Sequence, residues 1–241
     1  VARAAEAAGF HTLWANDALG GEGLAALAAA AEATTAIRLG VGLIPLDRRT
    51  PEQIAARVTE LGLPVERLTL GVGSGGAPGG LARVRDGVAA LRGLTAATIV
   101  VGALGPKMGR LAAEVADGVL LDWPTPTQAG AVRREIAAAA AVVGRPRPPV
   151  AGYVFTALGA AARYRLRADA DHYGSVPAYA AHFRRMQAAP LDAAVAGDTP
   201  EQVRAGLSAF DAELDETVVR ATVGVDTVDA YLEVLAAAAP T

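Results

Sequence analysis

The chain has 241 residues with a formal net charge of -3, and hydrophobic residues make up 52% of it but aromatic residues only 5%, so Ala, Leu and Val must fill any core. It contains no Cys, which excludes disulfides, Cys-ligated zinc, iron-sulfur clusters and thiol catalysis. Acidic residues outnumber basic ones, so the charge does not favour binding to nucleic acid, and a small molecule is the expected partner.

The amino end predicts a helix over residues 1–8 that ends at Gly9. Nothing before Val1 supplies a cap or a strand, so we expect the chain to lack one element there. The same stretch has no apolar core followed by a cleavage site, and no apolar run reaches the roughly 20 residues of a membrane span. We therefore expect a cytoplasmic protein with no membrane partner.

Strands and helices alternate regularly along the chain. The predicted strands are 12–16, 37–43, 68–72, 98–102, 118–122, 150–157 and 217–223. The predicted helices are 23–35, 51–63, 81–92, 107–116, 127–143, 160–170, 177–188, 200–211 and 228–239. Such alternation means a mostly parallel sheet, either open and doubly wound or closed as a TIM (β/α)8 barrel. Seven strands and a leading helix favour the α/β barrel without its first strand, and no linker divides residues 1–241, so one domain is predicted.

Two strands end in glycines, in the segments 38–46 and 67–76. Glycine lets backbone approach a ligand closely, and α/β enzymes place their sites at the carboxyl ends of parallel strands. The run Gly71–Gly76 fits G-x-G-x-x-G, but it does not lie in the first strand-helix unit, and the next strand ends at Val101–Leu104 without an acid. A dinucleotide site of the Rossmann type is therefore disfavoured.

A second glycine turn, Gly102–Met108, leads from a strand into a helix that follows Pro106. Backbone amides at such a helix start can hold a phosphate, although an ordinary barrel loop could have the same composition. Together with the glycines at 73–76, this turn favours a cofactor that carries a phosphate.

Several charged or aromatic residues lie at strand ends or inside strands. Asp17 can cap the next helix or contact a ligand, and Asp122–Trp123 can line a pocket or pack between loops. Arg220 interrupts an apolar strand, so it needs an anion, either a structural carboxylate or a phosphate.

The histidines favour structural roles. His11 precedes its strand, and His182 lies within a helix, where surface or packing roles prevail. The chain has neither H-E-x-x-H nor G-x-S-x-G, so a hydrolase with a resident metal or triad is unsupported, and no metal is predicted.

Taken together, these motifs resemble the luciferase-like monooxygenase superfamily, most closely its branch of coenzyme F420-dependent oxidoreductases. The segments that carry the resemblance are 4–17, 37–45, 49–51, 67–75, 105–108, 113–118, 173–179 and 196–201. The resemblance implies a barrel enzyme that uses the deazaflavin F420 for hydride transfer to or from a small organic substrate.

In that family the third barrel strand carries a bulge, often with a non-proline cis peptide, against which the cofactor ring rests, and the matching residues are Gly42-Leu43. By the same resemblance Ser74-Gly75 and the turn 103–105 would hold the phosphate, and Asp17 would meet polar edges of the ring. The cofactor-binding residues implied are Asp17, Gly42, Leu43, Gly73, Ser74, Gly75, Ala103, Leu104 and Gly105.

The chain also departs from the family pattern. Sugar-phosphate dehydrogenase members carry His and Glu where this chain has Ala18 and Gly76, so that substrate and that acid-base pair are not implied. Two alternatives stay open: an FMN-dependent monooxygenase of the same fold, and a catalytically degenerate barrel that acts as a binding protein. No catalytic residue is assigned. Family members commonly dimerise, so a homodimer is an expectation of the resemblance alone.

Overall fold

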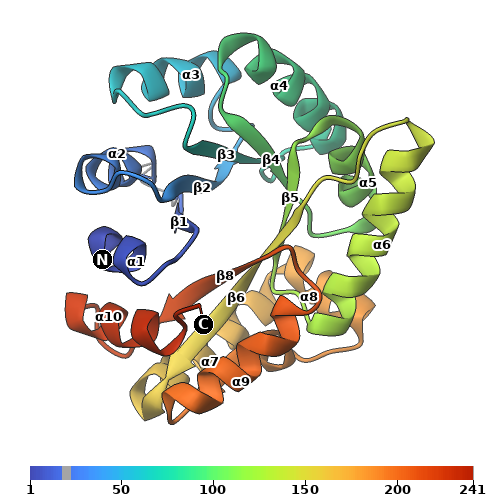
Figure 1. Cartoon of the computed structure of the whole chain (residues 1–241). Helices are drawn as coiled ribbons and strands as arrows, with labels where there is room; N and C mark the ends of the chain where they lie inside the picture. The colour runs from blue at the N-terminus through green and yellow to red at the C-terminus, as the bar shows by residue number, and fades with distance from the viewer. Residues whose placement is uncertain (18–22, 241) are drawn as a thin grey trace. The chain divides into compact units, whose positions relative to one another are not determined.

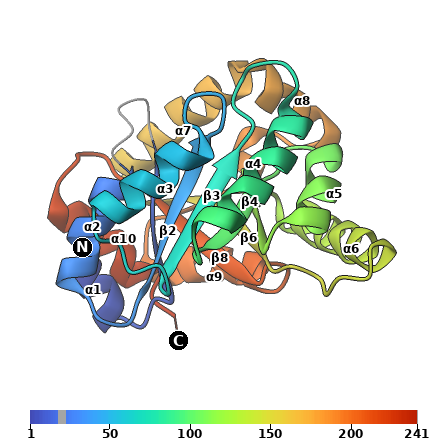
Figure 2. The ribbon, with the colours of Figure 1, turned by 90° about the horizontal axis from the view of Figure 1, so that it is seen from above.

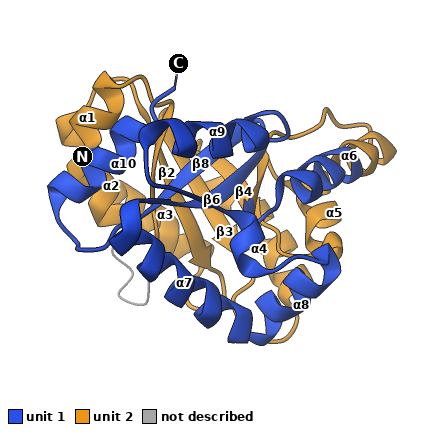
Figure 3. Cartoon of the chain, turned by 90° about the horizontal axis from the view of Figure 1, so that it is seen from below, with its two compact units in different colours: residues 1, 121–135, 150–241 blue, residues 2–120, 136–149 orange. Residues whose placement is uncertain are grey.

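The computed structural model describes residues 1–17 and 23–240, and Figure 1 labels the elements. The chain divides into two compact units (Figure 3). Unit 1 comprises residues 1, 121–135 and 150–241, and unit 2 comprises residues 2–120 and 136–149. Across the described residues, no helix is both long and apolar enough to cross a membrane.

Unit 2 is built from repeated strand-helix steps. Its strands are β1 (Thr12–Ala15), β2 (Arg38–Pro45), β3 (Leu68–Gly73), β4 (Thr98–Gly102) and the first part of β5 (Gly118–Asp122). Its helices are α1 (Ala2–Ala7), α2 (Gly23–Ala33), α3 (Pro51–Glu60), α4 (Gly80–Leu94) and α5 (Pro106–Val115). Each strand pairs in parallel with the next, and α2 to α5 lie along one face of the strands (Figures 1 and 2). Every residue of β3 is buried, so this strand lies at the centre of the unit's core.

Local sequence explains why these helices begin where they do. Thr50 caps α3 by accepting from the amide of Gln53, whose side chain in turn accepts from the amide of Thr50. Pro51 and Pro106 open α3 and α5, at a position where a missing N–H costs nothing. The starts of α3 and α5 are thus determined by residues within the first turn of each helix.

Unit 1 holds the end of β5 together with β6 (Val150–Leu158), β7 (Ala194–Gly197) and β8 (Glu216–Thr222). β6 pairs in parallel with both β7 and β8. The helical segments are α7 (Gly159–Ser175), α8 (Pro177–Met186), α9 (Pro200–Asp211), α10 (Val228–Ala237) and the short 3-10 helix η1 (Pro190–Ala193), while α6 (Pro126–Val142) begins in unit 1 and ends in unit 2.

The predicted elements are all present, with ends shifted by a few residues, and α7 runs five residues further than predicted, to Ser175. The predicted count of seven strands is wrong, because β7 is an additional strand. Its sequence, Ala-Val-Ala-Gly, has one β-branched residue and no clear alternation, so it has no strand signal of its own. It is a strand because it pairs with residues 155–158 of β6.

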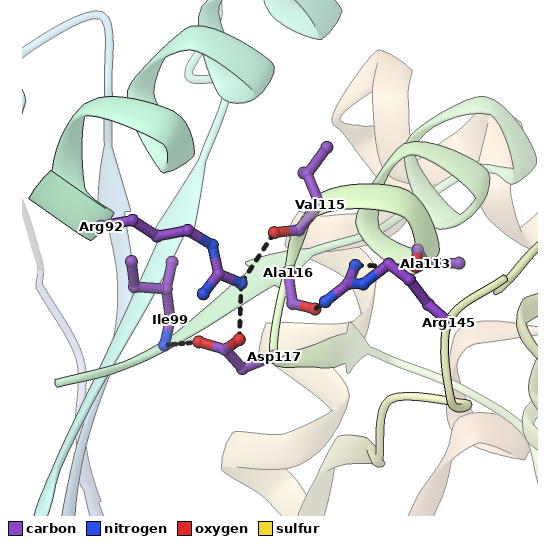
Figure 4. Close-up of polar contacts among 7 residues, drawn as sticks. All are labelled: Arg92, Ile99, Ala113, Val115, Ala116, Asp117 and Arg145. Atoms are coloured by element: carbon purple, nitrogen blue, oxygen red, sulfur yellow. Dashed lines mark hydrogen bonds and ion pairs between the residues drawn. The ribbon is translucent and has the colours of Figure 1, made fainter. Parts of the chain in front are cut away.

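A polar network joins α4, α5, β4 and β5 at the amino ends of the two strands (Figure 4). The Asp117 carboxylate accepts from the Ile99 amide at 2.9 Å and pairs with Arg92. Arg145 donates to two carbonyl oxygens near the end of α5, at 3.0 and 2.8 Å. These contacts satisfy carbonyls that have no partner inside their helix.

Carboxylates fix the amino ends of two further strands in the same way. Glu6 accepts from the amides of residues 35–37, at 3.0, 2.7 and 2.9 Å, just before β2. Asp215 accepts from the Val150 amide at 2.8 Å and pairs with Arg133 at 3.0 Å. The amides around Glu6 lower the pKa of its carboxyl group, with the Ile37 amide having the largest effect.

Candidate functional site

Strand β2, which contains Gly40 and Gly42, carries a bulge at Gly42-Leu43. Val41 pairs with Leu70 and Ile44 pairs with Val72, so three steps along β2 match two steps along β3. The peptide bond between Gly42 and Leu43 is cis. The predicted bulge with a cis bond at these two residues is therefore confirmed.

The bulge directs the Leu43 side chain across β3 and β4, where glycines make room for it. A Cβ atom placed on Gly102 would overlap Cδ1 of Leu43, and one on Gly73 would lie 3.2 Å from the same atom. A Cβ on Gly71 would overlap the carbonyl oxygen of Val41 and lie 3.1 Å from Cδ2 of Leu43. These glycines therefore have a packing role: they accommodate the bulge and the side chain it carries.

The loop after β3, predicted to hold a phosphate, already contacts a carboxylate of the chain itself. Oδ2 of Asp47 accepts from the amides of Gly76 at 2.8 Å and Ala77 at 3.1 Å. A Cβ on Gly75, whose φ is +68°, would overlap this carboxylate. The amides lower the pKa of the Asp47 carboxyl group, Ala77 most strongly, and nearby Arg83 lowers it further. Asp47 is not among the predicted site residues, and its only signal in the sequence is an acid two residues after the end of β2.

The carbonyl groups of the same loop point to an arginine. Arg83 donates to the carbonyl oxygens of Ser74 at 3.0 Å, Ala77 at 3.2 Å and Pro78 at 2.7 Å. The Ser74 hydroxyl donates to the carbonyl oxygen of Gly75 at 3.0 Å. Asp47 thus binds two amides of the loop, and Arg83 binds its carbonyl groups.

The second predicted turn, Ala103–Gly105, lies at the start of α5. The Ala103 amide bonds to the Leu120 carbonyl at 3.0 Å, and Gly105 occupies the N-cap position with an extended backbone. As a glycine, this N-cap residue has no side chain that could cap α5. Because the first amides of a helix have no partner inside it and carry partial positive charge, this end of α5 offers donors to an anion, with the exposed Lys107 in its first turn.

Asp17 is buried and has partners within the fold. Its Oδ1 accepts from the amide of Gly23, the first residue of α2, at 3.3 Å and lies 3.7 Å from a guanidinium nitrogen of Arg49. Of the two predicted roles, these contacts support the helix cap. Ala18, one of the two departures from the family pattern, lies outside the described residues.

Unit 1 contains a polar and aromatic cluster that the sequence analysis did not assemble. Asp122, at the end of β5, accepts from the Tyr179 hydroxyl at 2.7 Å. Its other carboxylate oxygen is buried and has no hydrogen-bond partner in the described part of the chain. Burial raises the pKa of Asp122, and burial together with Asp122 raises the pKa of Tyr179. The carboxyl group of Asp122 is thus more easily protonated than that of an exposed aspartate.

Arg220 joins this cluster from β8. Its guanidinium lies 4.3 Å from the centroid of the Phe155 ring, its register partner on β6, and 6.0 Å from the centroid of the Tyr173 ring. Among the described residues, no carboxylate forms an ion pair with it. The contacts of this cation are thus with aromatic faces, and its charge also acts to lower the pKa of Asp122, against the larger effect of burial. A phosphate contact, the other predicted role of Arg220, stays a prediction.

Trp123 packs within unit 1, as the packing alternative predicted. Its ring stacks on Phe155 with 3.8 Å between the centroids. The buried His182 ring, through Nε2, lies 3.1 Å from the Trp123 carbonyl oxygen, which can accept from it. His182 thus has the predicted packing role, whereas His11 is exposed and contacts the Thr12 hydroxyl.

Comparison with known proteins gives a family and a fold. The sequence model of the luciferase-like monooxygenase family matches residues 1–90 and 89–240. No curated protein sequence matches the chain.

Three similar solved structures are enzymes that use different cofactors. An F420-dependent secondary alcohol dehydrogenase, in complex with an F420-acetone adduct, is 15% identical, with a TM-score of 0.73 over 98% of this chain and 93% of that one. A coenzyme F420-dependent tetrahydromethanopterin reductase from Methanopyrus kandleri is 18% identical, with a TM-score of 0.73 over 98% and 92%. The oxygenating constituent of 3,6-diketocamphane monooxygenase from Pseudomonas putida, a Type II Baeyer-Villiger enzyme in complex with FMN, is 14% identical, with a TM-score of 0.74 over 99% and 89%.

At these identities the likeness shows the fold. It confirms the predicted class, a parallel α/β barrel of the TIM type. The described residues contain eight strands, and β7 is the one that the predicted count of seven lacks.

Proposed function

The chain belongs to the luciferase-like monooxygenase family, and we propose that it is an oxidoreductase that binds the deazaflavin F420 in unit 2 and acts on a small organic molecule. The observation that supports this most strongly is the bulge at Gly42-Leu43, with the Leu43 side chain laid across glycines of β3 and β4. FMN is the alternative cofactor for the same fold, since one of the similar structures holds FMN.

The residues around the bulge fit a planar ring. Leu43 is only partly buried, although its neighbours in β2 and β3 are buried, so it presents an apolar surface on a rigid support. The Leu43 side chain lies in space left by glycines at three positions, Gly71, Gly73 and Gly102. Asp17 is oriented by Gly23 and Arg49 and would offer a carboxylate to polar edges of the ring.

When bound, the cofactor would supply the hydride-transfer chemistry. The contribution of this chain is to bind the ring, to fix its orientation through Leu43, and to exclude water with the buried strands β2 and β3. A covalent nucleophile is not part of the proposal.

The two segments predicted to hold the phosphate differ in their fit. The start of α5 fits an anion, because its N-cap residue, Gly105, has no side chain that could accept from the first amides of the helix. The Ser74-Gly75 loop does not, because Asp47 occupies the neighbouring amides of Gly76 and Ala77. We therefore assign the phosphate to the start of α5.

Binding decides the proposal. Purified protein is titrated with F420 and with FMN while the fluorescence of each cofactor is followed. We expect one of them to bind, and we expect Leu43→Ala to weaken its binding by about tenfold, since the variant removes apolar contact with the ring. Gly76→Ala is the matched control, because a Cβ there would have no atom within 4 Å. A folded chain that binds neither cofactor would refute the proposal.

A binding protein without catalysis is the second candidate, favoured by the loop that Asp47 closes. It predicts that the cofactor binds but that neither reduced F420 nor reduced FMN is oxidised by any acceptor tried. Stopped-flow absorbance would detect turnover, and turnover would exclude this candidate.

We also propose that residues 1–241 form a single domain and that the chain forms a homodimer. A single cooperative unfolding transition would support the first statement, and two separate transitions would contradict it. Light scattering on the purified protein would measure the mass that tests the second.

A further inference from the structure

The Ser74–Ala77 loop has the form of an anion site, yet its anion comes from the chain. We propose that Asp47 is an internal anion that fills this loop and excludes a phosphate from it, so that Asp47 determines which cofactors the site accepts. The part of the inference that concerns cofactors rests on the proposed function. The part that concerns the loop stands on its geometry alone.

A single oxygen atom engages both amides. Oδ2 of Asp47 lies 2.8 Å from the Gly76 nitrogen and 3.1 Å from the Ala77 nitrogen, and residues 47 and 76 are 29 positions apart in sequence. Successive backbone N–H groups that converge on one oxygen form the concavity that binds phosphates in other proteins. A phosphate oxygen would therefore have to replace Oδ2 to make the same contacts.

Gly75 is what allows the carboxylate to come so close. Any side chain at this position would overlap the Asp47 carboxylate, and the φ of +68° is a conformation that favours glycine. The glycine that the sequence offers as a phosphate contact thus accommodates the side chain of Asp47.

The charges around the loop also oppose a second anion. Arg83 is the cation next to the loop, and three of its five N–H donors go to the carbonyl oxygens of Ser74, Ala77 and Pro78. A phosphate placed beside the ionised Asp47 would be repelled by its charge. If a phosphate displaced Asp47, the Asp47 carboxylate would lose its hydrogen bonds to the Gly76 and Ala77 amides.

A purely mechanical role for Asp47, tying two loops together, makes a different prediction. Asp47→Asn keeps an oxygen that can accept from both amides but removes the charge, whereas Asp47→Ala removes both. If the charge excludes phosphate, both variants admit it. If Asp47 is only a tie, Asp47→Asn behaves as the unaltered protein does. Asp86→Asn, an exposed acid on α4, is the matched control for net charge.

The first test uses inorganic phosphate and requires no cofactor. Thermal unfolding is measured with and without phosphate at constant ionic strength, with chloride as the reference anion. We expect phosphate to raise the melting temperature of Asp47→Asn and Asp47→Ala but not that of the unaltered chain or of Asp86→Asn. Equal responses of all four proteins would overturn the inference.

The second test compares FMN with riboflavin, which lacks the phosphate. The ratio of the riboflavin Kd to the FMN Kd should rise by about tenfold in both Asp47 variants, because each admits one further charge-assisted phosphate contact. An unchanged ratio in both variants would overturn the inference. Absence of flavin binding in every protein would refute an FMN site instead, and the phosphate measurement would still decide the role of Asp47.

Discussion

Replacing Gly102 with alanine tests whether the glycines of β3 and β4 are there to accommodate Leu43. The new Cβ would overlap Cδ1 of Leu43, which is the end of a flexible side chain, so some relief is available. Overpacking of this kind costs about 1–3 kcal/mol. Replacing glycine also restricts the unfolded chain, which returns about 0.5–1 kcal/mol.

The difference spans about 0–2.5 kcal/mol, and we expect Gly102→Ala to lower the free energy of unfolding by about 1 kcal/mol, near its middle. In a chain of this size each kcal/mol lowers the melting temperature by about 2–4 °C. Gly71→Ala should cost more, because its Cβ would meet the carbonyl oxygen of Val41, and backbone cannot swing aside. Denaturant unfolding, followed by circular dichroism, measures both.

A double-mutant cycle tests whether the collision with Leu43 causes the loss of stability in Gly102→Ala. Leu43→Ala removes the colliding atom, so Gly102→Ala should be harmless or slightly stabilising in that background, with a coupling energy of about 1 kcal/mol or more. Gly76→Ala, with open space around its Cβ, should change the free energy of unfolding by less than about 0.5 kcal/mol. The reasoning is refuted if Gly102→Ala is as harmless as Gly76→Ala, or if its cost persists when Leu43 is alanine.

Three further changes test contacts elsewhere in the fold. Burial raises the pKa of Asp122, so its contribution to stability is full below the ordinary pKa of about 3.9 and is lost as the pH rises through the raised value; the unfolding free energy of the unaltered chain relative to Asp122→Asn should fall over that range. The backbone amides lower the pKa of Glu6, so its contribution is present above about pH 4.3 and is lost as the pH falls through the lowered value; the gap between the unaltered chain and Glu6→Gln should close on acidification, and a gap that stays constant would contradict the role of the carboxylate. Arg145→Ala removes two hydrogen bonds to carbonyls of α5 and should cost about 1 kcal/mol in denaturant unfolding, more than Arg110→Ala on the exposed face of the same helix.

The sequence was sufficient to predict the features that depend on near neighbours in the chain. Pro51 and Pro106 mark helix starts, and the alternation of apolar strands with helices predicts the parallel α/β class. The bulge at Gly42-Leu43 could also be located, because the family resemblance aligns those residues directly.

Only the tertiary structure decided which groups meet across the fold. Leu43 reaches Gly102, Asp47 reaches Gly76, Asp122 reaches Tyr179, and β7 is a strand only because β6 lies beside it. Such contacts join residues far apart in the chain and leave no periodic signal in either segment. The glycines of β3, of the loop after it and at the end of β4 could therefore be read from the sequence as a binding face. They could not be read as the space that Leu43 and Asp47 occupy, since that depends on side chains from another strand and another loop.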